Sequence, residues 1–178
     1  MSRLDGRSLR NVLGCYATGV AIIATRTQAG EHIGVTVNSF ASVSLDPPLI
    51  LFSLANTANV LGHFLAAGYF TVNILSHRQE ALSNGFARPS TAPWESSRYS
   101  EAENGCALFE GCVAHLECER YAEVNGGDHR ILLGSVTQVN LHRTTDPLLF
   151  FRGRYGTFVS EVPVDQKAVS DFTVQGWG

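Results

Sequence analysis

The chain has 178 residues, a net charge of −3 and 44% hydrophobic residues, the size and composition of a single folded domain. It has no block of positive charge and no apolar run near the roughly 20 residues that span a bilayer, which argues against nucleic acid and membranes as partners. Arg3, Asp5, Arg7 and Arg10 stand where a signal peptide would need an apolar run, so we expect a soluble domain in the cytoplasm.

The first half of the sequence predicts one helix followed by strands. Apolar residues recur at three- and four-residue spacing from Leu4 to Tyr16, which indicates an amphipathic helix. The turn Gln28–Gly30 separates two β-branched runs, Val20–Thr25 and Ile33–Val37, and this pattern predicts a hairpin. Leu49–Leu54 follows two prolines and is expected to be another strand.

The second half predicts two short helices, a long loop and further strands. Asn59–Ala67 and a segment that begins after Ser76 both have candidate N-caps and helical spacing. Arg88–Gly105 is polar, contains two prolines and has little periodicity, so we expect a surface loop there. The other predicted strands are Tyr69–Leu75, Leu108–Arg120, Ile131–Leu141 and Leu148–Phe151.

About seven strands with few helices and no regular strand–helix alternation argue against a doubly wound nucleotide-binding fold. We predict a mainly β fold, an antiparallel, Greek-key-like barrel that is closed or nearly closed, with a few short helices. No repeat, low-complexity segment or linker divides the chain. Residues 1–160 are therefore expected to form one domain, and residues 161–178 a C-terminal tail.

Several catalytic motifs are incomplete in this sequence. The two glycines of Gly14–Gly19 have P-loop spacing, but no Lys-Ser or Lys-Thr follows, and a dinucleotide fingerprint and a nucleophile elbow are missing. Cys112, His115 and Cys118 suggest a zinc cluster, but in an extended strand the histidine and the cysteines would point to opposite faces. We therefore favour a strand with buried cysteines and no metal, which leaves chemistry that a bound cofactor would carry.

A polar segment from Asn38 to Val43 combines small hydroxyl and amide side chains with one aromatic residue at the end of a predicted strand. Backbone N–H groups and hydroxyls in such a segment can bond the carbonyls and ring nitrogens of a flat heterocycle such as isoalloxazine. The alternative is a hydroxyl-rich corner of a barrel, and composition does not separate the two.

An ordered set of segments carries a family resemblance. The set comprises Tyr16–Val20, Gly34–Pro48, Phe70–Leu75, Leu82–Ala87, Leu116–Cys118, Gly127–His129, Leu133–Val136 and Pro147–Tyr155. In these segments the chain resembles the short-chain flavin reductase family. The resemblance implies an FMN-binding split barrel that forms a homodimer. It also implies that the protein is the reductase component of a two-component flavin-dependent monooxygenase, of the kind found beside natural-product or aromatic-hydroxylating enzymes.

The same resemblance implies which residues bind the flavin, FAD or FMN. They are Thr36, Val37, Asn38, Ser39, Ala41, Ser42, Asn56, Thr57, Asn59, Phe86, Ala87 and Arg88. The family often has Ser where this chain has Asn38. The segment Asn56–Asn59 would meet the flavin phosphate or ribityl chain at a helix N-terminus, although N-capping alone would also explain it. Phe86–Arg88 would close over the flavin, but Arg88 could equally be a solvated surface charge.

His129 is implied to be the catalytic residue, at the place where the nicotinamide of NADH or NADPH stacks on the flavin. Arg152 and Tyr155 match positions near the same pocket. The alternative for His129 is a histidine that braces a turn by bonding Asp128. The implied reaction is hydride transfer from NAD(P)H to the flavin, with release of reduced flavin to a monooxygenase. A tightly bound flavoprotein electron carrier and a non-catalytic flavin or haem store are the alternatives.

Overall fold

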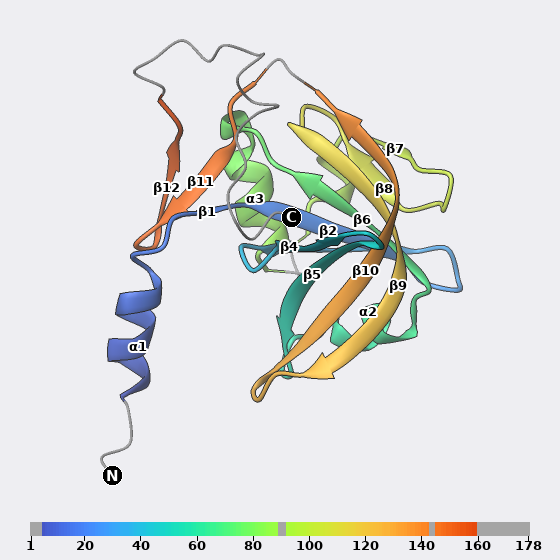
Figure 1. The fold of residues 1–178 in the computed structure, drawn as a ribbon. Coiled ribbons are helices and arrows are strands. Elements are labelled where there is room, and N and C mark those ends of the chain that lie inside the picture. Colours follow the sequence, from blue (N-terminus) through green and yellow to red (C-terminus); the bar gives the residue numbers. More distant parts are fainter. Residues whose placement is uncertain (1–4, 89–91, 143–144, 160–178) are drawn as a thin grey trace.

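A curved sheet of seven antiparallel strands is the framework of the protein (Figure 1). In sheet order the strands are β3 (His32–Val37), β2 (Ala21–Arg26), β6 (Tyr69–Ile74), β9 (Ala114–Asn125), β10 (His129–Leu141), β5 (Pro48–Ala55) and β4 (Ala41–Leu45). The computed structural model describes residues 5–88, 92–142 and 145–159. The C-terminal tail expected at residues 161–178 lies outside this range.

The sheet curls on itself without a closing ladder of hydrogen bonds. Its edge strands are β3 and β4, yet Ser39, just after β3, reaches across to β5. The Ser39 hydroxyl accepts a hydrogen bond from the Ser53 N–H (3.0 Å) and donates one to the Ser53 carbonyl (3.1 Å). The prediction of a mainly β, split-barrel fold is confirmed, in its nearly closed form.

Both faces of β2 are buried, which explains why its sequence is continuously apolar rather than alternating. Ala21 and Ile23 belong to the core inside the curled sheet, where Phe52 packs edge-on against Phe64 and Phe70. Ile22 and Ala24 point to the other face. There they meet a second core cluster beneath a helix and a short strand.

The second core cluster lies under α3 (Glu80–Phe86) and β8 (Ala107–Phe109). The predicted strand Leu108–Arg120 is divided into two, β8 and β9, because the chain turns between them at Gly111, whose φ of +81° suits glycine. The predicted surface loop is also more ordered than expected: it contains η3 (Trp94–Ser96) and β7 (Tyr99–Glu101), which pairs with β8.

Trp94 anchors this segment to the body of the protein. Its ring stacks on Phe109, with centroids 5.5 Å apart, and packs edge-on against Phe86 at 4.8 Å. Gly34 on β3 leaves room for both Phe86 and Trp94. We call residues 92–109 the flap, because they cover one face of the sheet and the end of α3.

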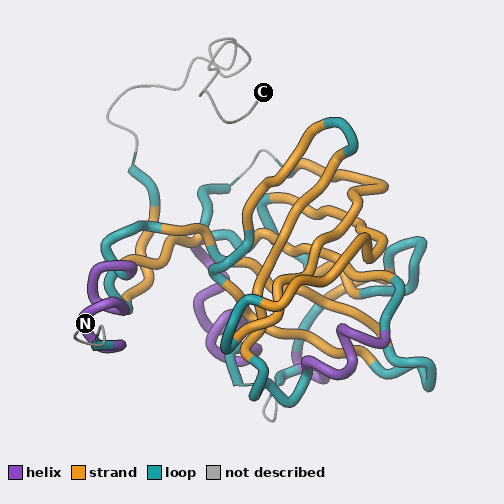
Figure 2. Tube along the Cα trace, turned by 60° about the horizontal axis from the view of Figure 1, so that its bottom comes forward, coloured by secondary structure: helices purple, strands orange, loops and turns teal. Residues whose placement is uncertain are grey.

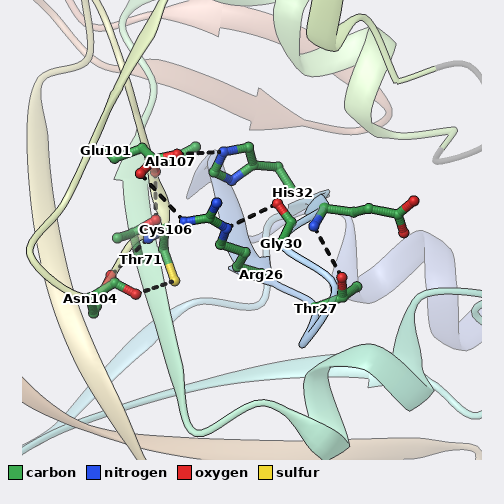
Figure 3. A network of polar contacts seen from close by, with 10 residues as sticks. Arg26, Thr27, Gly30, His32, Thr71, Glu101, Asn104, Cys106 and Ala107 are labelled. Carbon is green, nitrogen blue, oxygen red and sulfur yellow. Dashed lines mark hydrogen bonds and ion pairs between the residues drawn. The ribbon is translucent and has the colours of Figure 1, made fainter.

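A polar network ties the flap to the β2–β3 hairpin (Figure 3). One carboxylate oxygen of Glu101 lies 3.4 Å from the Arg26 guanidinium, and the other lies 3.2 Å from Nε2 of His32. Arg26 also donates a hydrogen bond from Nε to the Gly30 carbonyl (2.9 Å). Arg26 and Glu101 are partly exposed, so each ion pair is worth about 1 kcal/mol or less. The network therefore orients the flap, while the aromatic rings hold it.

The helix α2 (Leu61–Ala66) begins later than the predicted Asn59–Ala67, and its N-cap is Val60, without a capping side chain. Asn56 does not cap it, because its side chain is bound elsewhere. The predicted helix after Ser76 is present as the 3-10 turn η1 (His77–Gln79) followed by α3, and Gln79 accepts the Ser76 N–H at 2.9 Å as a capping box requires.

An arm projects from the body of the protein (Figures 1 and 2). It consists of α1 (Gly6–Leu13), β1 (Thr18–Gly19), β11 (Leu148–Phe151) and β12 (Arg154–Thr157), with the three strands in one small sheet. The predicted amphipathic helix forms, capped by Asp5, but no α1 residue is buried, and Val12 and Leu13 are 69% and 62% exposed. Its apolar face therefore has no partner within the described chain.

We predict that Gly34→Ala destabilises the protein. A Cβ at this position would lie 2.8 Å from two ring atoms of Phe86 and 3.0 Å from Trp94, so the flap or β3 must shift. Overpacking of this kind costs about 1–3 kcal/mol of unfolding free energy, to be measured by urea denaturation. Gly62→Ala is the control, because an added Cβ meets nothing within 4 Å in α2. Equal stability of the two variants would contradict the packing argument.

We also predict that stability falls below pH 6.5 because of His115. This buried ring donates from Nε2 to the Phe109 carbonyl (2.9 Å) and accepts from His142 at Nδ1 (3.1 Å). Burial lowers the pKa of His115 from its ordinary 6.5, so the unfolded chain binds this proton more readily than the folded one. The contribution of neutral His115 to the unfolding free energy is therefore complete above pH 6.5, and it is lost as the pH falls through the lowered pKa of His115 in the folded protein.

Urea denaturation at pH 7.5 and pH 5.5 measures the effect. His115→Gln keeps an amide that can donate to Phe109 but does not titrate, so its unfolding free energy should change less between the two pH values. An equal change in both proteins would assign the pH dependence to other groups.

Candidate functional site

The polar segment at the end of β3 is held in place by its own hydroxyl groups. Thr36 donates from Oγ1 to the Ser83 carbonyl on α3 (2.7 Å), and Ser39 bonds both backbone groups of Ser53. Val37 is buried. These side chains are therefore engaged inside the protein, and the exposed residues of the segment are Asn38, Ala41, Ser42 and Val43, with the backbone that joins them.

The loop after β5 is bonded to the turn that precedes His129. The Asn56 N–H donates to the Asp128 carbonyl (2.9 Å), and its side-chain amide donates to the Gly127 carbonyl (2.9 Å). Ala55, the last residue of β5, pairs with His129, the first residue of β10. Asn56 therefore joins the predicted phosphate loop to the predicted nicotinamide residue, while Thr57 and Asn59 are exposed.

These two groups of residues lie near one another. Ser53, which holds Ser39, is two residues before Ala55 on β5, and two residues of an extended strand span about 7 Å. The structure therefore places the end of β3, the Asn56–Asn59 loop and His129 at one end of the sheet, although they are far apart in sequence.

His129 forms a short hydrogen bond with its neighbour Asp128, with Nδ1 and Oδ1 only 2.7 Å apart. This bond lowers the pKa of Asp128, whose side chain is 94% exposed. With Nδ1–H donating to Asp128, Nε2 of the neutral ring becomes a hydrogen-bond acceptor. The turn-bracing bond is thus present, and it also fixes the tautomer that His129 would offer a substrate.

The end of α3 differs from its predicted role. Phe86 is fully buried in the second core cluster, against Trp94 and Phe109, so its ring is part of the core and is not on the surface of the chain. Its burial follows from the packing of the flap, which lies over the end of α3. Ala87 and Arg88, which follow it, are exposed.

A cavity of about 810 Å³ lies between the arm and the end of β3. Asn38 and Arg152 both line it, together with Tyr16, Thr18 and Phe150. The Arg152 backbone N–H donates to the Gly14 carbonyl (2.9 Å), so the turn between β11 and β12 is fastened to the end of α1. The volume is within the roughly 300–1,000 Å³ range of ligand pockets.

The three residues predicted to contact nicotinamide are divided between two regions. His129 lies at the turn of the β9–β10 hairpin, whereas Arg152 and Tyr155 belong to the arm, and the two regions are separated in Figure 1. Tyr155 directs its hydroxyl to Ser83 on α3 (2.8 Å). A single chain therefore does not bring this predicted trio together.

The histidine and cysteines that suggested a zinc site form hydrogen bonds or pack in the core. His115 bonds Phe109 and His142, and Cys118 lies in the core. Burial raises the pKa of the Cys112 and Cys118 thiols to about 12, which disfavours the thiolate that binds zinc. Within residues 5–88, 92–142 and 145–159, no group of three or more metal-ligating side chains is assembled. No helix in the described part of the chain is long and apolar enough to cross a membrane.

Comparison with known proteins identifies the family. Residues 13–158 match the model of the flavin reductase like domain. The chain belongs to this family. One curated relative is the FMN reductase (NADH) SmoA of Agrobacterium fabrum, which is 41% identical over 86% of this chain and 87% of its own length. Another is HsaB of Rhodococcus jostii, the reductase subunit of a flavin-dependent monooxygenase, which is 34% identical over 85% of this chain and 77% of its own length.

A solved structure supports the same assignment. The Streptomyces globisporus NADH:FAD oxidoreductase SgcE6, in complex with NAD and FAD fragments, is 34% identical, with a TM-score of 0.84 over 92% of this chain and all of that chain. Some relatives are longer: the chain spans only 49% to 58% of three curated proteins that match it at 38% to 41% identity.

Two serines that position the site were not predicted from the sequence. Ser53 and Ser83 make their contacts with residues 14 and 47 positions away, Ser39 and Thr36. A local pattern of polarity carries no information about such contacts. The resemblance did include the segment that contains Ser83, and this was the only available signal.

We predict that Ser39→Ala weakens both stability and flavin binding. The change leaves the N–H and carbonyl of Ser53 without their partner, a loss of about 1–3 kcal/mol in unfolding free energy, and it releases the end of β3 from β5. Denaturation and flavin fluorescence quenching measure the two effects. For stability the control is Ser42→Ala, an exposed serine on β4, whose unfolding free energy should stay within about 0.5 kcal/mol of wild type. A Ser39 variant as stable as this control would refute the role of the bridge.

Proposed function

We propose that the protein transfers a hydride from NADH to FAD or FMN and releases the reduced flavin to a partner monooxygenase. The observation that carries the proposal is the single sheet end that holds the β3 segment, the Asn56–Asn59 loop and His129, in a member of the flavin reductase-like family. The names of SmoA and HsaB support NADH as the hydride donor and a monooxygenase as the recipient.

The described residues fit a flavin. In the β3–β4 connection Asn38 is exposed and Phe40 is half-buried against the core, so the backbone at Asn38 can be approached closely. Bound flavin would supply the hydride acceptor, and NADH the hydride. The protein then needs no nucleophile.

The residues of this chain act by positioning. The bonds from Thr36 to Ser83 and from Ser39 to Ser53 fix the backbone between them, so its N–H groups can face the ring edge where negative charge develops. His129, with its tautomer set by Asp128, presents an acceptor to the nicotinamide amide. Holding the reacting atoms about 3–3.5 Å apart is the main requirement of such a reaction.

Steady-state oxidation of NADH and NADPH with riboflavin, FMN and FAD tests the proposal. We expect turnover with added flavin and faster reaction with NADH. A yellow protein that keeps stoichiometric flavin through dialysis would favour the alternative of a tightly bound flavoprotein. Flavin binding without NADH consumption would favour a flavin store.

We infer that the protein works in the cytoplasm. The pool of reduced nicotinamide that the reaction would draw on is found there, and the four cysteines, Cys15, Cys106, Cys112 and Cys118, are free thiols, as is usual for a reducing compartment.

A homodimer is the expected assembly. Val12, Leu13 and Tyr16 on the arm are 62% to 78% exposed, and a second copy of the chain would bury apolar surface of this kind. Light scattering should give twice the mass of 19.3 kDa. Val12→Asp combined with Leu13→Asp should then shift the mass toward the monomer, whereas a monomeric wild-type protein would contradict this prediction.

We predict that His129→Ala impairs the use of NADH and not the binding of flavin. The KM for NADH should rise or kcat should fall, while the flavin dissociation constant, measured without nicotinamide, stays within about threefold of wild type. Asp128→Asn is the matched variant, because it keeps His129 but weakens the 2.7 Å bond that sets its tautomer. A lower melting temperature with unaltered NADH kinetics would show that His129 only braces the turn.

A further inference from the structure

We propose that Ser83 is a positioning residue that couples the flavin segment of β3 to the arm and thereby sets the binding of NADH. This inference rests on the proposed function and adds a residue to it. Ser83 is fully buried in α3, and its hydroxyl and carbonyl groups bond two different elements.

The Ser83 carbonyl fixes β3. It lies among the last four carbonyls of α3, which an isolated helix leaves without complete partners. Here it accepts the Ala87 N–H at 2.9 Å and the Thr36 hydroxyl at 2.7 Å. The position of Thr36, two residues before Asn38, is therefore tied to the end of α3.

The Ser83 hydroxyl fixes the arm. It lies 2.8 Å from the Tyr155 hydroxyl on β12, and a longer contact of 3.5 Å joins Tyr155 to Asn84. The Tyr155 ring packs edge-on against Phe150, its partner on β11, with centroids 5.4 Å apart. Tyr155 thus joins two elements: its hydroxyl bonds Ser83 on α3, and its ring packs against Phe150 on β11 of the arm.

Together these bonds set two walls of the cavity. Asn38 lines one wall, and Phe150 and Arg152 line the other. The first wall follows Thr36 along β3, and the second is joined to Tyr155 through the β11–β12 hairpin. One buried serine therefore relates the flavin segment to the arm that carries Arg152, and Tyr155 acts on the substrate through Ser83 instead of by direct contact.

A double-mutant cycle tests this coupling. Ser83→Ala removes the hydroxyl but keeps the carbonyl that holds Thr36, and Tyr155→Phe removes the opposite hydroxyl but keeps the ring on Phe150. Each single variant should raise the KM for NADH about five- to tenfold, with the flavin dissociation constant within twofold of wild type. The double variant should be no worse than either single one, because all three lack the same bond.

Thr157→Val, an exposed residue on the same strand, is the control and should bind NADH as wild type does. Two single effects that multiply in the double variant would overturn the coupling. So would a lower melting temperature with an unchanged KM for NADH, because this is what a purely structural bond predicts.

The outcome is distinguishable from failure of the proposed function. If the wild-type protein oxidises no NADH with any flavin, the proposed function is wrong, and the coupling is then decided by hydrogen exchange. Ser83→Ala should speed amide exchange in β12 and leave β6 unchanged, since β12 is held to α3 through Tyr155. Unchanged exchange in β12 would overturn the coupling.

Discussion

The bond of the Ser39 hydroxyl to both backbone groups of Ser53 is the interaction on which the site depends. An open sheet has two edges whose backbone groups lack partners, and here one edge is turned toward β5 by a single side chain. Because Ser53 is two residues from Ala55, and Ala55 pairs with His129, the position of the flavin segment follows from this bridge. Its net energy is modest, but leaving the groups of Ser53 unpaired would be costly.

The rest of the fold keeps that sheet end rigid. Burial of β2 on both faces puts a core on each side of the sheet, one inside the curl and one under α3 and the flap. The second core contains a cluster of aromatic rings that fixes the end of α3 through Phe86 and Trp94. Since Ser83 lies in that helix, the aromatic packing also supports the hydrogen bonds to Thr36 and Tyr155.

This arrangement suits a protein that releases its flavin. The residues gathered at this sheet end offer backbone amides, hydroxyls and one histidine, and Arg10 and Arg152 lie across the cavity on the arm. Strong ion pairs to the phosphate would slow release, whereas neutral hydrogen bonds can orient the ring and still let it leave. Hydride transfer between two bound cofactors needs orientation more than it needs a reactive side chain.

The sequence by itself determined the elements whose pattern is local. The apolar run of β2, the hairpin to β3, the strand Leu148–Phe151 and the capping box at Ser76 were all predicted, since each depends on residues a few positions apart. The order of the family segments also gave the fold class and the flavin chemistry. The site was predicted as a set of segments, but not as a set of contacts.

Only the tertiary structure decided how those side chains are used. Phe86 matched a segment expected to cover the flavin but is buried by Trp94 and Phe109 from the flap. Asn56 was expected to meet phosphate, but its amide bonds Gly127, 71 residues away, and Tyr155 bonds Ser83 across 72 residues. Hydrophobic and polar periodicity reports which face of an element is buried, but the partner across that face is set only when distant segments pack together.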